Sequence, residues 1–192
     1  MQFSHESDAE LIHAYLRGNE YALTVIINRY KDKIYTTIYM LVKDKFLAED
    51  IFQDAFLKMI KTIRDGRYSE QGKFLPWAIR VAHNLCMDHF RRTRQQIPVT
   101  LPDGQDISYL FGAGDSASDG IEKRQVHQCV RKLVEELPEE QREVIVLRIY
   151  SDLSFKQISD LTGVSINTAL GRMRYGLINL RKMIAEQQLV LR

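Results

Sequence analysis

Apolar residues recur every three or four positions over most of the chain, which is the spacing of one buried face of an α-helix. In the first half this pattern predicts helices over residues 8–17, 21–41, 46–63 and 73–94, the first of them capped by Ser7 or Asp8. No stretch alternates apolar and polar residues for long enough to predict a strand. The first half of the chain is therefore expected to be all-α.

The helical spacing stops between residues 96 and 120. This stretch holds two of the four prolines and four of the ten glycines, and its only charged side chains are four aspartates. Turn formers at this density predict a flexible linker of about 25 residues. Unstructured loops of that length are rare inside one compact domain, so we expect two domains, over residues 1–95 and 121–192.

After the linker, helical spacing returns over residues 121–137 and 138–149. Two further helices are predicted over residues 155–162 and 166–186, separated by the turn Gly163-Val-Ser. A short helix, a glycine turn and a longer helix form the helix-turn-helix pattern. The predicted fold class is all-α, with two helical domains joined by a flexible linker and a helix-turn-helix in the C-terminal domain.

Composition narrows the class of protein. The 192 residues are 45% hydrophobic and 27% charged, as in ordinary globular proteins. The apolar runs are too short to cross a bilayer, and Glu6, Asp8 and Glu10 argue against a cleavable signal peptide, so a cytoplasmic location is expected. Two cysteines cannot form a disulfide framework.

The net charge of +2 conceals an uneven distribution. Residues 28–95 hold fourteen basic and eight acidic side chains, and residues 141–192 hold eight and four. Residues 96–120 hold four acidic side chains and no basic ones. Two basic segments on either side of an acidic one are typical of a chain with two nucleic-acid contacts, although two solvated helical domains would give the same count.

Sequence motifs for catalysis and for nucleotide binding are absent, so neither an enzymatic activity nor a cofactor is expected. The recurring His83, Cys86 and His89 suggest a metal site at first sight. Side chains three residues apart drift by about 60° around a helix, so these three converge poorly. We expect no metal here, and the alternative is that Cys86 is a small core residue.

Two predicted helices combine features suited to DNA. The helix over residues 73–94 mixes Trp77 and two phenylalanines with arginines, as in surfaces that bind single-stranded DNA, although a core helix would also turn Trp77 inward. The final helix opens with Ser165, Asn167 and Thr168, which the helix-turn-helix arrangement would bring to the major groove. Ser165 serves equally well as an N-cap alone, and a helical hairpin without DNA remains the alternative.

A third helix carries Asp50 and Asp54 four residues apart, with Gln53 between them. Like charges at this spacing mildly destabilise a helix, so an external basic partner would explain them. A solvated helix face is the simpler alternative.

Three segments in this order resemble an extracytoplasmic-function sigma factor, a small two-domain member of the sigma-70 family of bacterial RNA polymerase. They are AEDIFQDAFLKM (48–59), FLPWAIRVAHNLCMDHFRR (74–92) and LPEEQREVIVLRIYSDLSFKQISDLTGVSINTALGRM (137–173). The resemblance extends over nearly the whole chain, including the position of the linker.

The resemblance implies three sets of contacts. The first domain would bind the clamp helices of the largest polymerase subunit through Asp50, Gln53, Asp54, Phe56 and Leu57. It would capture unpaired bases of the promoter −10 element with Lys73, Trp77, Arg80, Asn84, Asp88, Arg91 and Arg92. The second domain would lie on the polymerase flap and read the −35 element with Ser165, Asn167, Thr168, Arg172, Arg174 and Tyr175.

The resemblance also implies a course for the acidic linker, toward the RNA exit path. Members of the family are often held inactive by a membrane-anchored anti-sigma factor, which adds a candidate partner to core polymerase and promoter DNA. The chain departs from the family pattern at Ala169-Leu170-Gly171, where Leu170 cannot donate a hydrogen bond to a base. The −35 sequence that it would read therefore stays open.

Two other classes compete with this interpretation. One is a helix-turn-helix regulator whose N-terminal half binds a ligand or dimerises. The acidic helix at Asp50 and the basic helix that follows argue against it, since a ligand domain needs neither. The other is a nucleic-acid hydrolase, for which the chain lacks a suitable cluster of carboxylates or histidines.

Overall fold

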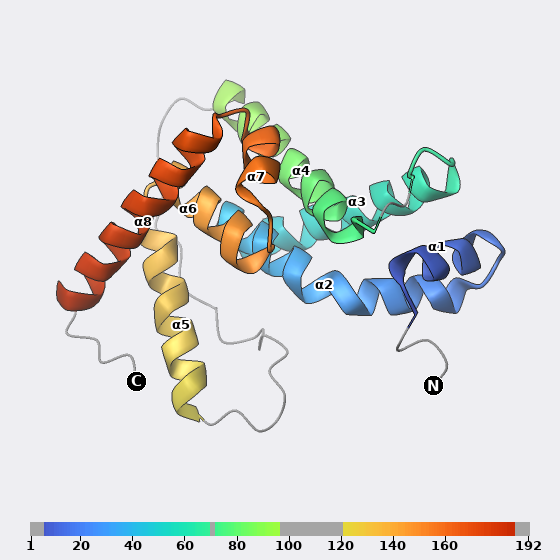
Figure 1. Cartoon of the computed structure of the whole chain (residues 1–192), viewed down its shortest axis with the longest axis horizontal. Coiled ribbons are helices and arrows are strands. Elements are labelled where there is room, and N and C mark those ends of the chain that lie inside the picture. Colours follow the sequence, from blue (N-terminus) through green and yellow to red (C-terminus); the bar gives the residue numbers. More distant parts are fainter. Residues whose placement is uncertain (1–5, 70–71, 97–120, 187–192) are drawn as a thin grey trace.

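A computed structural model describes residues 6–69, 72–96 and 121–186, and every regular element within those ranges is a helix (Figure 1). The helices of the first half are α1 (Asp8–Leu16), α2 (Glu20–Val42), α3 (Lys45–Arg64) and α4 (Phe74–Gln96). Those of the second half are α5 (Ile121–Glu136), α6 (Glu139–Ile145), a π-helical segment η2 (Val146–Tyr150), α7 (Phe155–Thr162) and α8 (Ile166–Glu186). The predicted all-α fold is confirmed. The predicted linker over residues 96–120 lies outside the described residues, apart from Gln96, which is the last residue of α4.

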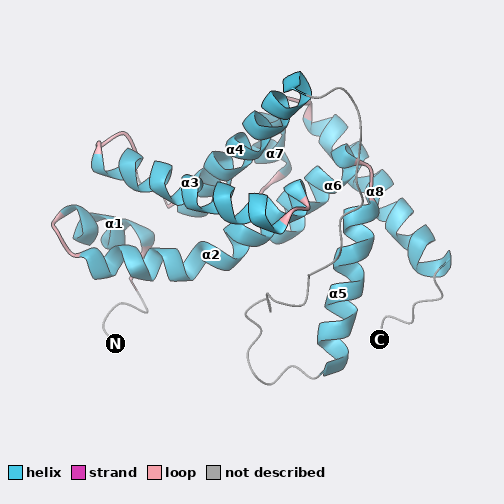
Figure 2. Cartoon of the chain, turned by 180° about the vertical axis from the view of Figure 1, so that it is seen from behind, coloured by secondary structure: helices cyan, strands magenta, loops and turns pink. Residues whose placement is uncertain are grey.

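In the N-terminal domain, α1, α3 and α4 pack against the long helix α2 (Figures 1 and 2). Ser7 begins α1 with a capping box, in which its side chain and that of Glu10 satisfy each other's backbone N–H groups. Asp8 then ties α1 to α2, because it accepts hydrogen bonds from Arg29 and from the Tyr30 hydroxyl, both at 2.6 Å. Burial and this hydrogen bond raise the pKa of Tyr30 to about 12.

In the C-terminal domain α8 packs across α6 and α7. The turn between α7 and α8 is the predicted one: Gly163 has a φ of +72°, which glycine adopts without strain, and it ends α7. The Ser159 hydroxyl donates to the Val164 carbonyl at 2.6 Å, which fixes the crossing of the two helices. The helix-turn-helix predicted from the sequence is therefore present.

One segment differs from its predicted form. The sequence predicts a regular helix over residues 138–149, but the helix widens to a π-helix from Val146. Four consecutive residues, from Val144 to Leu147, are buried because this segment lies between α2 on one side and α8 on the other. Successive side chains of a regular helix point about 100° apart, so four buried neighbours mean that the helix is covered on all sides. The prediction from the sequence rests on one apolar face, and that pattern does not indicate burial on every side or a π-helix.

Gly176 allows α8 to approach α6 closely. A Cβ atom there would lie 2.7 Å from Cδ1 of the buried Ile145, whereas a Cβ at Gly171 on the same helix would meet nothing within 4 Å. We expect Gly171→Ala to stabilise the protein by up to about 1 kcal/mol through helix propensity. Gly176→Ala should be about 1–3 kcal/mol less stable than Gly171→Ala, because overpacking offsets the same gain. Thermal and urea unfolding of the two variants measure the difference, and equal stabilities would contradict this packing.

Candidate polymerase and nucleic-acid interfaces

The acidic residues of α3 share one exposed helix face. Asp50, Gln53, Asp54 and Leu57 follow the spacing of successive helical turns, and all four are exposed. Leu57 is 66% exposed. One turn before Asp50, Phe46 is 67% exposed on the same face, a feature that the sequence pattern alone did not single out. We call these five residues the α3 face: acidic in the middle, with a large apolar side chain at each end.

Phe56 does not belong to this face. It is 9% exposed and its ring lies 4.7 Å from that of Phe52, centroid to centroid, within the core of the N-terminal domain. The structure thus separates two neighbouring residues that the sequence analysis grouped together, since Phe56 points into the domain and Leu57 points out.

The candidate −10 residues lie along one side of α4. Arg80, Asn84, Arg91 and Arg92 are exposed, as is Lys73 immediately before the helix. Asp88 is half-buried and accepts a hydrogen bond from Arg91 at 3.0 Å, so it orients that guanidinium. We call this set, with Trp77, the α4 face.

Trp77 belongs to an aromatic cluster that joins α4 to the preceding loop. Its ring lies 4.1 Å from that of Tyr68 and 5.6 Å from that of Phe74, which is itself 2% exposed. Trp77 is half-buried, so part of its ring packs inward as in a core helix, while its contact with DNA stays a prediction. Tyr68 was not identified from the sequence because it lies in a turn-rich loop, where periodicity gives no indication of packing.

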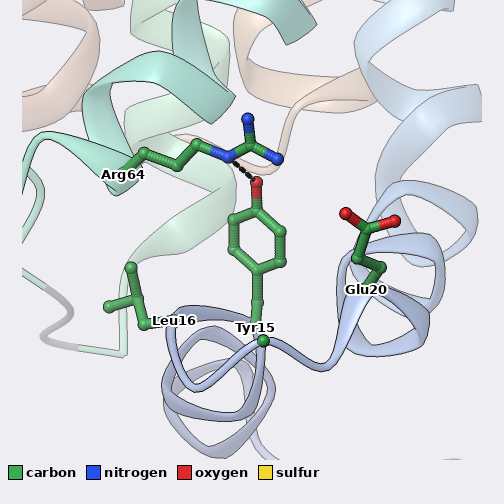
Figure 3. A pocket seen from close by; sticks show the side chains of 5 residues that line it. Tyr15, Leu16, Glu20 and Arg64 are labelled. Atoms are coloured by element: carbon green, nitrogen blue, oxygen red, sulfur yellow. Dashed lines mark hydrogen bonds between the residues drawn. The ribbon is translucent and has the colours of Figure 1, made fainter.

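The residue from which the loop before α4 starts, Arg64, is held by a contact with α1. Arg64, at the end of α3, donates from Nε to the Tyr15 hydroxyl and lies over that ring, 5.5 Å from its centroid (Figure 3). Tyr15, Leu16, Gly18, Glu20 and Arg64 line a small pocket at this corner. The contact joins the C-terminal end of α3, where the loop starts, to the C-terminal end of α1.

At the start of α8, Ser165 serves as the N-cap. Its hydroxyl accepts from the Thr168 N–H at 3.0 Å and lies 2.8 Å from the Thr168 hydroxyl. Asn167 and both of these residues are exposed, so the start of the helix is open to a ligand. The capping role is established, and it is compatible with contact to DNA.

The two arginines of the predicted −35 set are placed differently. Arg172 is turned toward α6, where it forms an ion pair with Glu140 at 3.0 Å, and its side chain is 20% exposed. Arg174 is exposed, and Tyr175 is 63% exposed. Within Ala169-Leu170-Gly171, where the chain departs from the family pattern, Ala169 is buried and Leu170 is exposed. The accessible donors along this part of α8 are therefore those of Arg174 and Tyr175.

Two of the residues considered for a metal, His83 and Cys86, lie in the core. His83 is 3% exposed and its Nε2 lies 2.8 Å from Glu143 of α6, while Cys86 is fully buried. Burial raises the pKa of the Cys86 thiol to about 12. Within the described ranges, no group of three or more histidine, cysteine or carboxylate side chains is arranged to hold a metal ion.

Comparison with protein families matches both halves. The family described as "Sigma-70 region 2" matches residues 26–96, and "Sigma-70, region 4" matches residues 127–170. The first match contains all of the α3 face and all of the α4 face. The second contains the helix-turn-helix up to Leu170.

Curated relatives extend the similarity. The chain is 27% identical to the "ECF RNA polymerase sigma factor SigW" of Bacillus subtilis, covering 88% of this chain and 92% of the relative. It is 25% identical to the "RNA polymerase sigma-H factor" of Pseudomonas aeruginosa, covering 88% and 90%. Both relatives are similar over almost their whole lengths.

Solved structures share the fold. The sigma factor RpoE in complex with the anti-sigma factor NepR from Bartonella quintana superposes with a TM-score of 0.65 at 17% identity, covering 85% of this chain and 96% of that one. CnrH in complex with the cytosolic domain of CnrY gives 0.61 at 18% identity, covering 94% and 99%. At these identities the likeness establishes the arrangement of helices.

None of the helices in the described part of the chain combines the length and apolar character that crossing a bilayer requires. The two family matches, the relatives and the helical fold agree with the order of motifs along the sequence. Sigma factors are initiation factors without catalytic activity. The chain belongs to the sigma-70 family as a sigma factor of the extracytoplasmic-function type, and it directs promoter-specific transcription initiation by RNA polymerase.

Proposed function

We propose that the α3 face binds core RNA polymerase, on the clamp helices of the largest subunit. The observation that carries this proposal is the exposed combination of Asp50, Gln53 and Asp54 between two exposed apolar side chains, Phe46 and Leu57. Interface hot spots are apolar or aromatic anchors surrounded by polar groups, and this face has that composition. Phe56 supports the face from within the domain instead of contacting the partner.

The α4 face is the proposed binding surface for unpaired −10 DNA. Arginine and lysine side chains contact phosphates, and a half-exposed indole offers a surface on which a base can stack. Turning a base out of the duplex costs a few kcal/mol, which contacts in a binding pocket must offset. The cluster of Tyr68, Phe74 and Trp77 holds the loop before α4 in position for this purpose.

The start of α8 is the proposed −35 reader, with the domain bound to the polymerase flap. Ser165, Asn167 and Thr168 would contact phosphates or base edges at the N-terminal end of the helix. Arg174 and Tyr175 supply the hydrogen-bonded base readout that Leu170 cannot. Arg172 contributes by holding α8 against α6 through Glu140.

Three broader assignments belong to the same proposal. The domain boundaries are residues 1–95 and 121–192, with an acidic linker over residues 96–120 that runs toward the RNA exit path. The chain works in the cytoplasm, where polymerase and DNA are found, without a catalytic activity of its own. An anti-sigma factor is a proposed partner, since solved relatives were captured with one.

Assembly with core polymerase tests the α3 face. We expect Asp50→Ala with Gln53→Ala to weaken binding to purified core polymerase by about tenfold or more, because both polar anchors leave the interface. Circular dichroism and the unfolding midpoint should match those of the parent chain, since both side chains are exposed. Lys61→Ala, an exposed change at the other end of α3, is the matched control and should bind normally. Unchanged binding by the double variant would exclude this face, and loss of the fold would assign it a structural role.

A further inference from the structure

The first turns of α8 expose two large apolar side chains beside the polar residues of the proposed −35 reader. Ile166 and Leu170 are each 44% exposed. They are four residues apart, so they are neighbours on one side of the helix. Asn167 and Arg174 flank Leu170 at helical spacing and are exposed as well. The apolar pair is therefore part of the surface that is proposed to enter the major groove.

The opposite side of α8 packs against the rest of the domain. Ala169 and Gly176 are buried, and Arg172 turns toward α6 to pair with Glu140. Leu170 follows Ala169 directly, so its side chain points about 100° away from that buried side. The hydrophobic core of the described residues includes Ala169 but neither Leu170 nor Ile166. Packing within the domain therefore does not account for the exposed pair.

Gly171 lies next to Leu170, and the fold does not require a glycine at this position either. Glycine inside a helix is destabilising relative to alanine. A Cβ atom at Gly171 would meet nothing within 4 Å, so there is room for a side chain. Glycine is also the residue that lets a backbone approach a ligand closely. Its position beside the exposed pair suits a helix that lies deep in a groove.

Charge identifies nucleic acid as the partner of this surface. Helix α8 contains four basic side chains, and its single acidic side chain is Glu186, the last residue. Three of the basic side chains, Arg174, Arg181 and Lys182, are exposed. Phosphates provide no partner for an apolar side chain, but base edges do. The major groove presents one apolar group, the C5-methyl of thymine.

We propose that Leu170, with Ile166 beside it, recognises a thymine of the −35 element by contact with the C5-methyl group, and that Gly171 permits the close approach which this contact needs. This assignment rests on the proposed function of α8 and adds to it the identity of one base. Leu170 cannot donate a hydrogen bond, so its recognition depends on apolar contact alone.

Deoxyuridine in place of thymine tests the contact, because the two bases differ only in the methyl group. Holoenzyme is assembled from core polymerase and the full chain, and its affinity for a promoter fragment is measured at one stated salt concentration. Each thymine of the −35 element, on either strand, is replaced in turn. We expect one position at which deoxyuridine weakens binding about three- to fivefold, as for the burial of one methyl group. The Leu170→Ala holoenzyme should bind both fragments equally at that position.

Leu177→Ala is the matched control. Leu177 is 38% exposed on the same side of α8, about two turns beyond Leu170, and its variant should keep the full preference for thymine. The assignment of Leu170 is overturned if Leu170→Ala keeps that preference, or if the parent chain distinguishes the two bases at no position. If the parent holoenzyme binds all −35 variants equally, the proposed function of α8 fails and this assignment fails with it.

Gly171→Ala tests the close approach separately. The variant should fold at least as stably as the parent chain, since its Cβ has open space around it. Its holoenzyme should nevertheless bind the promoter about fivefold or more weakly and show a smaller preference for thymine over deoxyuridine, because the added methyl group lies between the helix and the base edges. Parental affinity and preference in this stable variant would contradict the role given to Gly171.

Discussion

Leu57→Ala should weaken binding to core RNA polymerase by about 5- to 150-fold, which corresponds to about 1–3 kcal/mol, and should leave the stability of the chain unchanged. Leu57 is 66% exposed, so its truncation removes no contact from the core. Its side chain is one of the two apolar ends of the α3 face. The affinity is measured by fluorescence anisotropy of labelled chain titrated with purified core polymerase.

The neighbouring residue provides a matched comparison. Phe56→Ala removes a ring that is 9% exposed, and large-to-small changes of this kind cost about 3–5 kcal/mol of folding free energy. It should therefore lower the midpoint of unfolding, and its effect on polymerase binding should follow the loss of folded chain. The assignment of the two residues would be refuted if Leu57→Ala unfolded the protein, or if Phe56→Ala weakened binding at full stability.

Arg174→Ala should weaken promoter binding by the holoenzyme by about 1–3 kcal/mol, or 5- to 150-fold, and should relax the preference at one position of the −35 element. Arg174 is exposed on α8 beside Tyr175, and a guanidinium that contacts a guanine edge provides discrimination of this size. Binding to a promoter fragment and to a library of −35 variants, at a stated salt concentration, measures both effects.

Arg172→Ala tests whether Arg172 recognises bases or only holds α8 against α6. Arg172 pairs with Glu140, whose side chain is 70% exposed, and exposed pairs of this kind are worth at most about 1 kcal/mol. We expect a small loss of stability and a reduced affinity that is uniform across −35 variants. A change of sequence preference in Arg172→Ala, with none in Arg174→Ala, would reverse the two roles.

Local signals in the sequence predicted most of the helices. The helix-turn-helix is an example: Ser154 and Gln157 form a capping box, Gly163 ends the first helix and Ser165 caps the second, so both boundaries are encoded within a few residues. The family resemblance was confirmed on the same segments. The domain boundaries and the residues assigned to each contact remain predictions.

Features that depend on contacts between distant segments could not be predicted. Phe46 and Phe56 fit the helical periodicity equally well, and only the packing of α3 shows that one is exposed and the other buried. The π-helix at Val146 packs against α2, which lies about a hundred residues earlier in the chain. From the sequence alone, Gly176 is a residue of low helix propensity within a helix. Only the tertiary structure shows that a side chain there would contact Ile145 of α6.

The junction between the domains is the clearest case of this limit. Thr37 of α2 and Ser151 after η2 have hydroxyls 2.8 Å apart but lie 114 positions apart in the chain, and neither stands out from its neighbours in sequence. Asp152 lies in a turn, and its partner Lys33 belongs to a helix whose exposed face carries other charges. Their pairing is a property of the tertiary structure.

The central claim, that this chain gives core polymerase its choice of promoters, is tested most directly by transcription of total genomic DNA in vitro. Purified core polymerase, with and without the chain, transcribes the fragmented genome of its source organism, and the 5′ ends of the RNA are sequenced. We predict a set of start sites that depends on the chain and shares two short upstream motifs at a fixed separation. Identical 5′ ends with and without the chain would contradict the account.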